Sequence, residues 1–418
     1  MTAFPIPTLT GTDQLQLESV ALSDIAAQFG TPTYVYSRKA LTDAYRAYET
    51  ALAGRKAMIC YAVKANSNLG ILDAFARLGA GFDIVSGGEL QRVIAAGGDP
   101  AKVVFSGVGK TEAEMRLALE AGIGCFNIES PEELVRLGET AATMGKVAPI
   151  AFRVNPDVDP KTHPYISTGL KANKFGVAYD DALSLYRRAA QTPGIAIHGI
   201  ASHIGSQLLD AAPVAEAAER VLALVEQIND AGIELHHIDI GGGMGIRYED
   251  ESAPHADAFL APVLEVLKDR PEAIHLEPGR SLVGNAGLLL TRVEFLKHGE
   301  EKHFAIVDAA MNDLARPALY DAYHAVVEVE KSDVTADVYD VVGPICESGD
   351  FLARDRKLAV RAGDLLAILS AGAYGMTMAS NYNTRPRAAE VMVDGDRCHP
   401  IRARERVEDL FANEQRLP

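Results

Sequence analysis

A cysteine and a glutamate stand side by side in the stretch "GPICESGD", residues 343–350, where flanking glycines favour a turn. A thiol has an ordinary pKa near ~8.5, so the Cys346 thiol can serve as an acid near neutral pH, beside the carboxylate of Glu347. The alternative is a small buried cysteine without chemistry, which is the interpretation favoured for Cys60 and Cys125 because both lie inside apolar runs.

Other charged side chains stand where apolar runs end. Lys64 ends one run, in "YAVKAN", and similar positions are occupied by Asp83, Arg153, His203 and Glu277. An ammonium group at the end of an apolar strand is costly unless it is paired, or unless its pKa is lowered so that it acts as a nucleophile. The alternative for Lys64 is a side chain that simply extends to solvent.

A run of three glycines, residues 241–243, follows another apolar stretch. Glycines expose backbone N–H groups to an anion such as a phosphate, although a plain turn is the alternative. A nucleophilic lysine together with a phosphate site is the minimum that pyridoxal phosphate needs, because the cofactor is held as a Schiff base at one end and by its phosphate at the other.

Two further residues fit a pyridoxal phosphate site. A carboxylate such as Glu277 keeps the pyridine nitrogen protonated, which makes the ring a strong electron sink; the alternative is a salt bridge to Arg280. The flat ring of His203 can stack on the cofactor, although a core histidine is the alternative.

These residues need a fold that brings strand ends together. Eight short apolar runs alternate with amphipathic stretches between residues 57 and about 280, which predicts repeated βα units and a (β/α)8 barrel. The chemistry of such barrels gathers at the carboxyl ends of the strands. The eight runs are "AMICYAV", "GFDIV", "VVFSG", "IGCFNIE", "PIAFRV", "HGIASHI", "HHIDI" and "IHLEPG".

Helices are expected between several of these runs, in "SGGELQRVIAAG", "SPEELVRLGETAATMG" and "APVAEAAERVLALVEQINDAG". In the second of them, Ser130 is a capping hydroxyl, Pro131 stands in the first turn, and two glutamates follow where the helix dipole favours acids.

The pattern changes after residue 285 to runs rich in β-branched residues, which predicts a second, mostly antiparallel β domain. We expect residues 36–285 to form the barrel, residues 286–418 the β domain, and residues 1–35 an N-terminal segment that pairs with the β domain through a weak strand, "QLQLESV". The β-domain runs are "LLLTRVEFLKHG", "KHFAIVD", "AVVEVE", "DVYDVVG", "LLAILS" and "AEVMVDG".

Composition narrows the class of protein. A length of 418 residues suits about two or three domains, of which two is the simpler expectation. A formal net charge of -17 without clustered Lys and Arg argues against a nucleic-acid partner. Signal-peptide and membrane-spanning patterns are not apparent, and four scattered cysteines without a CxxC pair suit neither a disulfide framework nor a zinc site. We therefore expect a cytoplasmic enzyme that binds no metal and no membrane.

The chain resembles the diaminopimelate decarboxylases, a family of pyridoxal-phosphate enzymes with an alanine-racemase-like barrel and a β domain. The resemblance covers nearly the whole chain and rests on long motifs in the family's order. They are "YAVKAN", "FDIVSGGEL", "GLKANKFGV", "SHIGSQ", "GGGMGI", "EPGRSLV", "ARPALYDAYH", "GPICESGD" and "GAYG".

The resemblance implies a role for each matching residue. Lys64 would bind the cofactor covalently, His203 would stack on its ring, Glu277 would bind the pyridine nitrogen, and Asp83 and Arg153 would support them. The residues implied around the phosphate or the substrate are Ser206, Gly242, Gly243, Gly279, Arg280 and Tyr374.

The family also implies a homodimer in which the "GPICESGD" loop enters the active site of the other subunit. Cys346 would then be the proton donor and Glu347 a substrate ligand. Loss of CO₂ leaves a carbanion that a positioned acid must protonate, so a thiol at this place is chemically reasonable.

The implied reaction converts meso-2,6-diaminopimelate to L-lysine and CO₂. Arg280 and Arg316 would clamp the distal carboxylate, Glu347 would pair with the distal ammonium, and Tyr320 and Tyr374 would add hydroxyl contacts. For Arg316 the alternative is a surface arginine that begins a helix.

Three other functions stay open on the sequence alone. An ornithine or arginine decarboxylase would share the fold, cofactor and lysine; an alanine-racemase-like enzyme would place an arginine at the pyridine nitrogen, where this chain has Glu277. The third is a catalytically inactive relative that binds a protein partner.

Overall fold

The computed structural model describes residues 5–159 and 174–418, so residues 169–173 of the motif "GLKANKFGV" lie outside the described residues. The described chain divides into two compact units. The barrel unit comprises the described parts of Ala44–Ile246 together with Ser252–Ser281. The β unit comprises the described parts of Met1–Asp43 together with Arg247–Glu251 and Leu282–Pro418.

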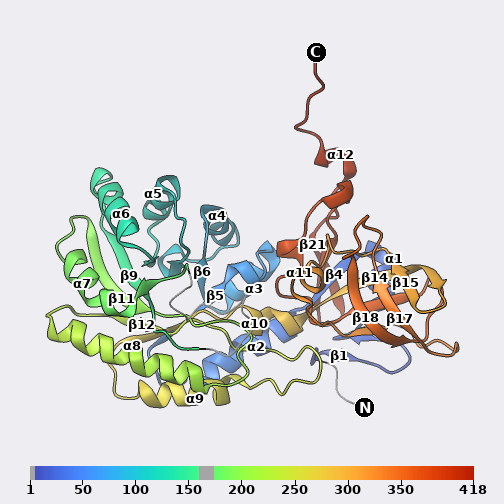
Figure 1. The fold of residues 1–418 in the computed structure, drawn as a ribbon, viewed down its shortest axis with the longest axis horizontal. Coiled ribbons are helices and arrows are strands. Elements are labelled where there is room, and N and C mark those ends of the chain that lie inside the picture. Colours follow the sequence, from blue (N-terminus) through green and yellow to red (C-terminus); the bar gives the residue numbers. More distant parts are fainter. Residues whose placement is uncertain (1–4, 160–173) are drawn as a thin grey trace. The chain divides into compact units, whose positions relative to one another are not determined.

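The barrel unit contains a closed barrel of eight parallel strands (Figure 1). The order β9-β11-β12-β13-β5-β6-β7-β8 closes through pairing of β8 with β9. Each of the eight apolar runs of the sequence overlaps one of these strands, so the predicted (β/α)8 barrel is confirmed. The strands are β5 (Ala57–Ala62), β6 (Gly81–Ile84), β7 (Val103–Phe105), β8 (Cys125–Ile128), β9 (Ala148–Asn155), β11 (Ile195–Ala201), β12 (His237–Asp239) and β13 (Ala273–Leu276).

Helices follow the strands around the barrel in Figure 1. Ser130 caps α6 by accepting a hydrogen bond from the Glu133 N–H at 3.1 Å, with Pro131 in the first turn, as the sequence predicted. The helices are α2 (Arg38–Ala51), α3 (Leu69–Arg77), α4 (Gly87–Ala95), α5 (Glu112–Ala121), α6 (Pro131–Thr143), α7 (Tyr179–Ala189), α8 (Ala212–Asp230), α9 (Ala256–Val266) and α10 (Arg280–Val283).

Short elements complete this part of the chain. The two-residue strand β10 (Val177–Ala178) pairs with β9 outside the closed barrel. The 3-10 helices of the barrel unit are η1 (Val63–Ala65) and η2 (Pro100–Lys102), and η3 (Gly284–Ala286) lies in the β unit.

Small apolar side chains fill part of the barrel interior. Cys60, Val104, Cys125 and Ala151 form one buried cluster, each 2% exposed or less. The prediction that Cys60 and Cys125 are small buried cysteines is therefore confirmed. This packing closes the barrel below its mouth, so polar groups gather at the carboxyl ends of the strands.

The β unit is built on a second sheet, which has nine strands and is mostly antiparallel, as predicted. Its main path is β18-β17-β15-β14-β4-β20-β21, with β19 on β14 and β16 on β19. The strands are β4 (Thr33–Ser37), β14 (Gly287–His298), β15 (His303–Val307), β16 (Val326–Glu328), β17 (Asp337–Val342), β18 (Phe351–Leu358), β19 (Leu365–Ile368), β20 (Ala389–Asp394) and β21 (Arg397–Arg402).

The N-terminal strand of this sheet is β4, which lies between β14 and β20. The stretch "QLQLESV" forms two short strands, β2 (Gln16–Leu17) and β3 (Val20–Ala21), in a separate sheet with β1 (Leu9–Thr10). It still contributes to the core of the β unit through Leu17, which packs in one cluster with Leu288 and Val391.

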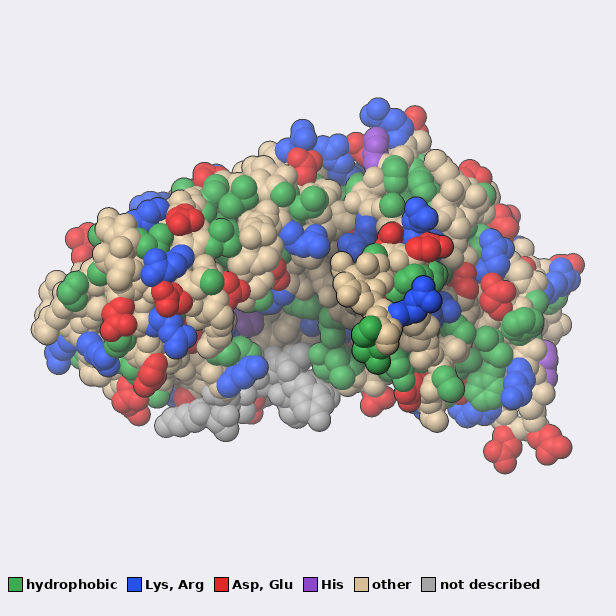
Figure 2. All heavy atoms as spheres, turned by 90° about the horizontal axis from the view of Figure 1, so that it is seen from above, with side chains coloured by type: hydrophobic (Ala, Val, Ile, Leu, Met, Phe, Trp, Pro, Cys, Tyr) green, Lys and Arg blue, Asp and Glu red, His purple; other side chains and the backbone are tan. Residues whose placement is uncertain are grey.

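The β unit also holds α1 (Leu22–Phe29), α11 (Arg316–Tyr320) and α12 (Val407–Leu410), with η4 (Met376–Met378) and η5 (Tyr382–Thr384). Within the described residues, every helix is too short or too polar to cross a membrane. Acidic and basic side chains are interspersed over the face shown in Figure 2.

Candidate active site

An ion pair joins two neighbouring strand ends at the barrel mouth. Lys64 lies in η1 directly after β5, and its Nζ is 2.6 Å from Oδ2 of Asp83 on β6. The Asp83 side chain is fully buried, whereas the Lys64 side chain is 41% exposed. Asp83 Oδ1 is buried without a hydrogen-bond partner among the described residues. Lys64 is therefore held by a buried charge and still reaches the mouth of the barrel.

A second carboxylate, Glu277, follows β13 in the same unit. Its Oε1 accepts hydrogen bonds from Asn127 Nδ2 at 3.3 Å and from Ser106 Oγ at 3.5 Å. Burial, and then the negative charges of Asp239 and Asp83, raise the pKa of Glu277 well above its ordinary value. Burial likewise raises the pKa of Asp239 to about 6. A cationic group placed against Glu277 would relieve this repulsion.

His203, which follows β11, is held as a neutral ring. Its Nδ1 accepts a hydrogen bond from the Gly242 N–H at 3.2 Å, so this nitrogen carries no proton. Burial, and then the charges of Arg153 and Lys64, lower the pKa of His203 well below its ordinary value. A neutral imidazole with a fixed tautomer offers a flat face at the barrel mouth.

The glycine run after β12 forms a crowded backbone cradle. A Cβ on Gly242 would lie 2.2 Å from the Glu277 carbonyl oxygen, and one on Gly243 would lie 2.4 Å from the Gly205 carbonyl oxygen. The φ angle of Gly243 is +101°, which side-chain-bearing residues rarely adopt. Only glycine fits at these positions, because the backbone of neighbouring segments lies so close.

Arg280 lies beside this cradle, at the start of α10. Its side chain donates hydrogen bonds to Ser206 Oγ from Nη2 at 3.0 Å and from Nε at 3.3 Å, and the residue is only 7% exposed. Gly279 packs tightly, since a Cβ there would lie 3.1 Å from the Cβ atoms of Ala62 and Ala65. A buried guanidinium beside glycines suits the binding of a phosphate or a carboxylate.

The carboxylate of Glu129, which follows β8, holds two loops and an arginine side chain together in the barrel unit. It accepts hydrogen bonds from the Gly107 N–H at 2.7 Å and the Gly176 N–H at 3.0 Å. Arg153 Nη1 lies 3.5 Å from Glu129 Oε1, and the guanidinium also lies over the Phe175 ring, 4.9 Å from its centroid. One buried glutamate therefore joins loops that follow β7 and precede β10 to a side chain of β9.

In the β unit, Arg316 is buried at the start of α11. Its Nη1 lies 2.9 Å from His324 Nε2, and His324 Nδ1 donates to the Leu369 carbonyl oxygen at 2.8 Å, so Nε2 accepts from the arginine. The guanidinium lies over the Tyr248 ring, 4.6 Å from the centroid. Arg316 is thus a held, buried cation, which argues against the alternative of a surface arginine.

The "GPICESGD" loop presents Cys346 and Glu347 outward, and both are exposed. Asp350 shapes the loop, because its carboxylate accepts hydrogen bonds from the N–H groups of Ile345 and Met311, each at 2.7 Å. Cys346 N–H donates to Asn383 Oδ1 at 3.1 Å. The thiol and the carboxylate are therefore displayed on a turn that a buried aspartate organises.

Two tyrosines complete the predicted set in the β unit. Tyr320 ends α11 and is partly exposed. Tyr374 is also partly exposed and has a φ of +55°, an unusual backbone conformation for a non-glycine residue. The Tyr382 hydroxyl donates to Glu347.

The predicted residues of the barrel unit therefore lie together at the mouth of the barrel. Those of the β unit form a separate set. Sequence reasoning missed several of their partners. Asp239 and Glu129 are charged residues at the ends of apolar runs, which is the signal that singled out Lys64, so the same signal could have identified them. The residues missed are Ser106, Asn127, Glu129, Asp239, Tyr248, His324 and Asp350.

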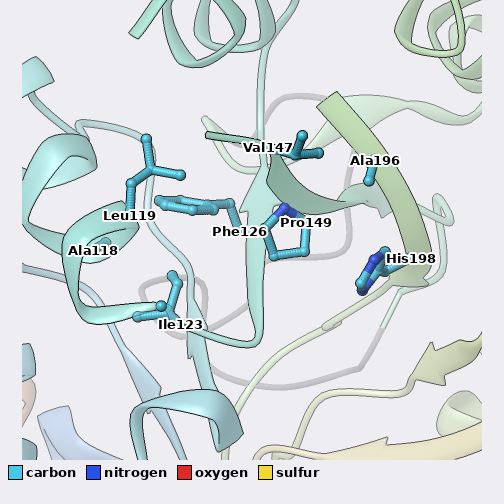
Figure 3. A pocket seen from close by; sticks show the side chains of 9 residues that line it. Ala118, Leu119, Ile123, Phe126, Val147, Pro149, Ala196 and His198 are labelled. Carbon is cyan, nitrogen blue, oxygen red and sulfur yellow. The ribbon is translucent and has the colours of Figure 1, made fainter. Parts of the chain in front are cut away.

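A cavity of about 360 Å³ also opens in the barrel unit, as Figure 3 shows. Phe126, Pro149 and Ala196 line it from the amino-terminal halves of β8, β9 and β11, and His198 lines it from the middle of β11. The predicted site residues are not among those that line this cavity. Its place at the amino ends of the strands separates it from the mouth, where barrel chemistry occurs.

Comparison with known proteins gives three results. The family model "Pyridoxal-dependent decarboxylase, pyridoxal binding domain" matches residues 38–284. Diaminopimelate decarboxylase of Pseudomonas aeruginosa is 60% identical over 405 residues, covering 97% of this chain and 98% of the relative. A crystal structure of diaminopimelate decarboxylase from M. jannaschii in complex with L-lysine superimposes with a TM-score of 0.95 at 38% identity, covering 100% of this chain and 99% of the other.

A more distant structure is similar in fold alone. Lysine/ornithine decarboxylase from Vibrio vulnificus, complexed with putrescine, has a TM-score of 0.79 at 24% identity, covering 90% of this chain and 97% of the other.

Proposed function

Because this chain belongs to the diaminopimelate decarboxylases within the pyridoxal-dependent decarboxylases, we propose that it decarboxylates meso-2,6-diaminopimelate to L-lysine and CO₂ with pyridoxal phosphate. The observation that carries the proposal is the Lys64–Asp83 ion pair at the mouth of a barrel that also presents Glu277 and a glycine cradle. This is the final step of lysine biosynthesis.

The residues of the barrel mouth fit pyridoxal phosphate. The cradle at Gly242 and Gly243 has no room for side chains, and its backbone N–H groups would face the phosphate. Arg280 with Ser206 would add a buried cation and a hydroxyl. Lys64 would bind the aldehyde carbon. Bound pyridoxal phosphate would supply an electron sink for the electron pair that remains when CO₂ leaves.

Glu277 would hold a proton at the pyridine nitrogen. Burial and neighbouring carboxylates raise its pKa, so a cation facing it is strongly favoured. His203 would lie against the ring as a neutral imidazole, because burial, and then the charges of Arg153 and Lys64, disfavour the charged form. Asp83 and Arg153 would keep Lys64 and the mouth in position.

The residues of the β unit would recognise the distal end of the substrate. Arg316 is preorganised by His324 and Tyr248 to hold a carboxylate in bidentate fashion. Tyr320 and Tyr374 would add hydroxyl contacts, and Glu347 of the partner subunit would pair with the distal ammonium. Ornithine, arginine and lysine lack the distal carboxylate that Arg316 would bind.

We further propose that the active enzyme is a homodimer with shared active sites. Cys346 of the partner subunit would deliver a proton to the substrate carbon after CO₂ leaves, beside the partner subunit's Glu347. The support is that the loop displays both groups on its exposed side instead of burying them. The exposed thiol also fits the reducing cytoplasm proposed for this protein.

A substrate panel tests the proposed reaction. Purified protein with pyridoxal phosphate is supplied separately with meso-diaminopimelate, ornithine, arginine and lysine, and the released CO₂ and the amine product are measured. We expect turnover of diaminopimelate to L-lysine and little release from the other three. Preference for ornithine or arginine would contradict the assignment of Arg316, and absence of CO₂ from every substrate would contradict the function.

A further inference from the structure

Two histidines and an aspartate meet at one end of the large sheet of the β unit. His298 is the last residue of β14, His303 is the first of β15, and Asp337 is the first of β17. His298 and His303 are direct partners in the antiparallel register of the hairpin. One nitrogen or oxygen atom from each of the three side chains lies within 4.8 Å of the others.

The spacing of the His303 and Asp337 atoms suits a shared ion better than a direct hydrogen bond. His303 Nε2 lies 3.6 Å from Asp337 Oδ2, which is longer than an N–H···O hydrogen bond. Two ligands of one tetrahedral Zn²⁺ ion, each about 2.0–2.1 Å from the metal, stand about 3.3 Å apart. A shift of a few tenths of an ångström would bring this pair to coordination distance.

Neighbouring groups already orient the ligands. The Val338 N–H donates to Asp337 Oδ1 at 2.8 Å, which fixes the carboxylate while Oδ2 faces His303. His298 Nε2 lies 3.2 Å from the Tyr339 hydroxyl, so this ring can donate its Nε2 proton to the tyrosine and leave Nδ1 for a metal. Hydrogen bonds of this kind commonly hold metal-binding side chains in place.

Two lysines adjoin the histidines in sequence, Lys297 before His298 and Lys302 before His303. Lys302 directs its Nζ to Asp340 Oδ2 at 2.7 Å, and the Asp340 side chain is only 2% exposed. The ammonium charge is thereby compensated by a buried carboxylate. Asp337 supplies a negative charge whose side chain is 48% exposed, so an ion can reach it from solvent.

We propose that His298, His303 and Asp337 form a binding site for a divalent transition-metal ion, with Zn²⁺ as the representative ligand. Two imidazoles and one carboxylate match the preference of Zn²⁺ and disfavour Mg²⁺, which prefers oxygen ligands. Water completes the coordination. The ion links the ends of β14, β15 and β17, and the site is independent of the proposed decarboxylation.

Equilibrium dialysis of the pyridoxal-phosphate-loaded enzyme against Zn²⁺, followed by metal analysis, tests the site. We expect wild-type protein to retain about one more zinc ion per chain than His303→Ala or Asp337→Asn does. The affinity of this site for Zn²⁺ should fall about 100-fold or more in either variant. His399→Ala is the matched control, because His399 is an exposed histidine of β21 in the same unit. Mg²⁺ in place of Zn²⁺ should show no such difference.

Zinc bound elsewhere, for example at an exposed thiol, is common to all four proteins and cancels in the comparison. Asp337→Asn preserves side-chain shape, and circular dichroism identifies any variant that fails to fold. Anomalous diffraction at the zinc edge should place a peak between the three side chains. Equal zinc retention by wild type, Asp337→Asn and His399→Ala, or a peak only at another position, would overturn the proposal.

Discussion

Lys64 Nζ lies 2.6 Å from Asp83 Oδ2, and this contact joins an exposed ammonium to a fully buried carboxylate across adjacent barrel strands. The pairing anchors the lysine where the strands end, while its exposure leaves it accessible to a small molecule. A lysine so placed can exchange its ionic contact for a covalent bond to an aldehyde without reorganising the barrel.

The first prediction concerns Lys64→Ala, which removes the proposed covalent link to the cofactor. We expect loss of the visible absorption of protein-bound pyridoxal phosphate, together with loss of CO₂ release. Lys56→Ala is the matched control, because Lys56 is exposed immediately before β5, at the opposite end of the same strand. Retention of the bound-cofactor absorption by Lys64→Ala would contradict the assignment.

The second prediction concerns Glu277→Gln. An amide cannot carry the negative charge that holds a proton on the pyridine nitrogen, so we expect kcat to fall about 10- to 100-fold, the worth of a charged hydrogen bond of about 1.5–3 kcal/mol. Cofactor absorption should remain, which separates this variant from Lys64→Ala. Glu216→Gln, an exposed position on α8, should match wild type. Unchanged kcat for Glu277→Gln would remove Glu277 from the reaction.

The third prediction tests both the thiol and the shared dimer. Cys346→Ala should retain bound cofactor and lose turnover, whereas Cys398→Ala, a partly exposed cysteine of β21, should stay active. Inactive Lys64→Ala and Cys346→Ala proteins, unfolded and refolded together in equal amounts, should regain about a quarter of wild-type activity, because half of the dimers then hold one complete site. Absence of recovery from a mixture that forms dimers would contradict the shared site.

Much of the fold could be predicted because each barrel strand is an apolar run between amphipathic helices. The strands missed outside the barrel have physical reasons. β18, "FLARDRKL", is an edge strand whose Arg354, Asp355 and Lys357 are exposed, so it lacks an apolar run. β4 is buried along its whole length but only five residues long.

The candidate site was predictable where chemistry follows a strand end, as for Lys64 and Glu277. The partners of Arg316 could not be predicted, because Tyr248 and His324 come from distant segments that only the folded β unit brings together. The Asp239 carboxylate was overlooked inside the apolar run "HHIDI", although its negative charge, after burial itself, raises the pKa of Glu277.

The fourth prediction concerns acid stability. The rings of His237 and His275 stack at 4.1 Å, and burial lowers both pKa values, that of His275 to about 4. In the unfolded chain both titrate near ~6.5, so between these values the folded protein binds fewer protons than the unfolded chain. Their contribution to stability is therefore complete above pH 6.5 and is lost as pH falls toward 4.

Thermal unfolding of wild type should accordingly show Tm falling from pH 7 to pH 5, and His275→Gln should flatten this dependence. Each histidine can contribute at most about 1.4 kcal/mol per pH unit. The exposed His399→Gln should follow wild type. An identical pH dependence for His275→Gln and wild type would show that other groups determine acid sensitivity.

The fifth prediction separates the length of an ion pair from its burial. Lys110 Nζ lies 2.7 Å from Glu133 Oε1 with side chains 1% and 8% exposed, whereas Lys268 Nζ lies 2.6 Å from Glu265 Oε1 with side chains 57% and 72% exposed. Lys110 also donates to the carbonyl oxygens of Gly107 and Asn127, at 2.8 and 2.7 Å. Distance alone predicts equal effects on stability for the two pairs.

Burial predicts a large difference. Lys110→Met leaves the Glu133 carboxylate buried without its cation and should lower the free energy of unfolding by about 3–5 kcal/mol. Lys268→Met should change it by less than about 1 kcal/mol, because water already screens that pair. Urea unfolding of both variants measures the two effects, and Lys110→Met/Glu133→Gln should recover part of the loss because no buried charge remains. Equal destabilisation by the two methionine substitutions would show that the buried pair is no more important than a surface one.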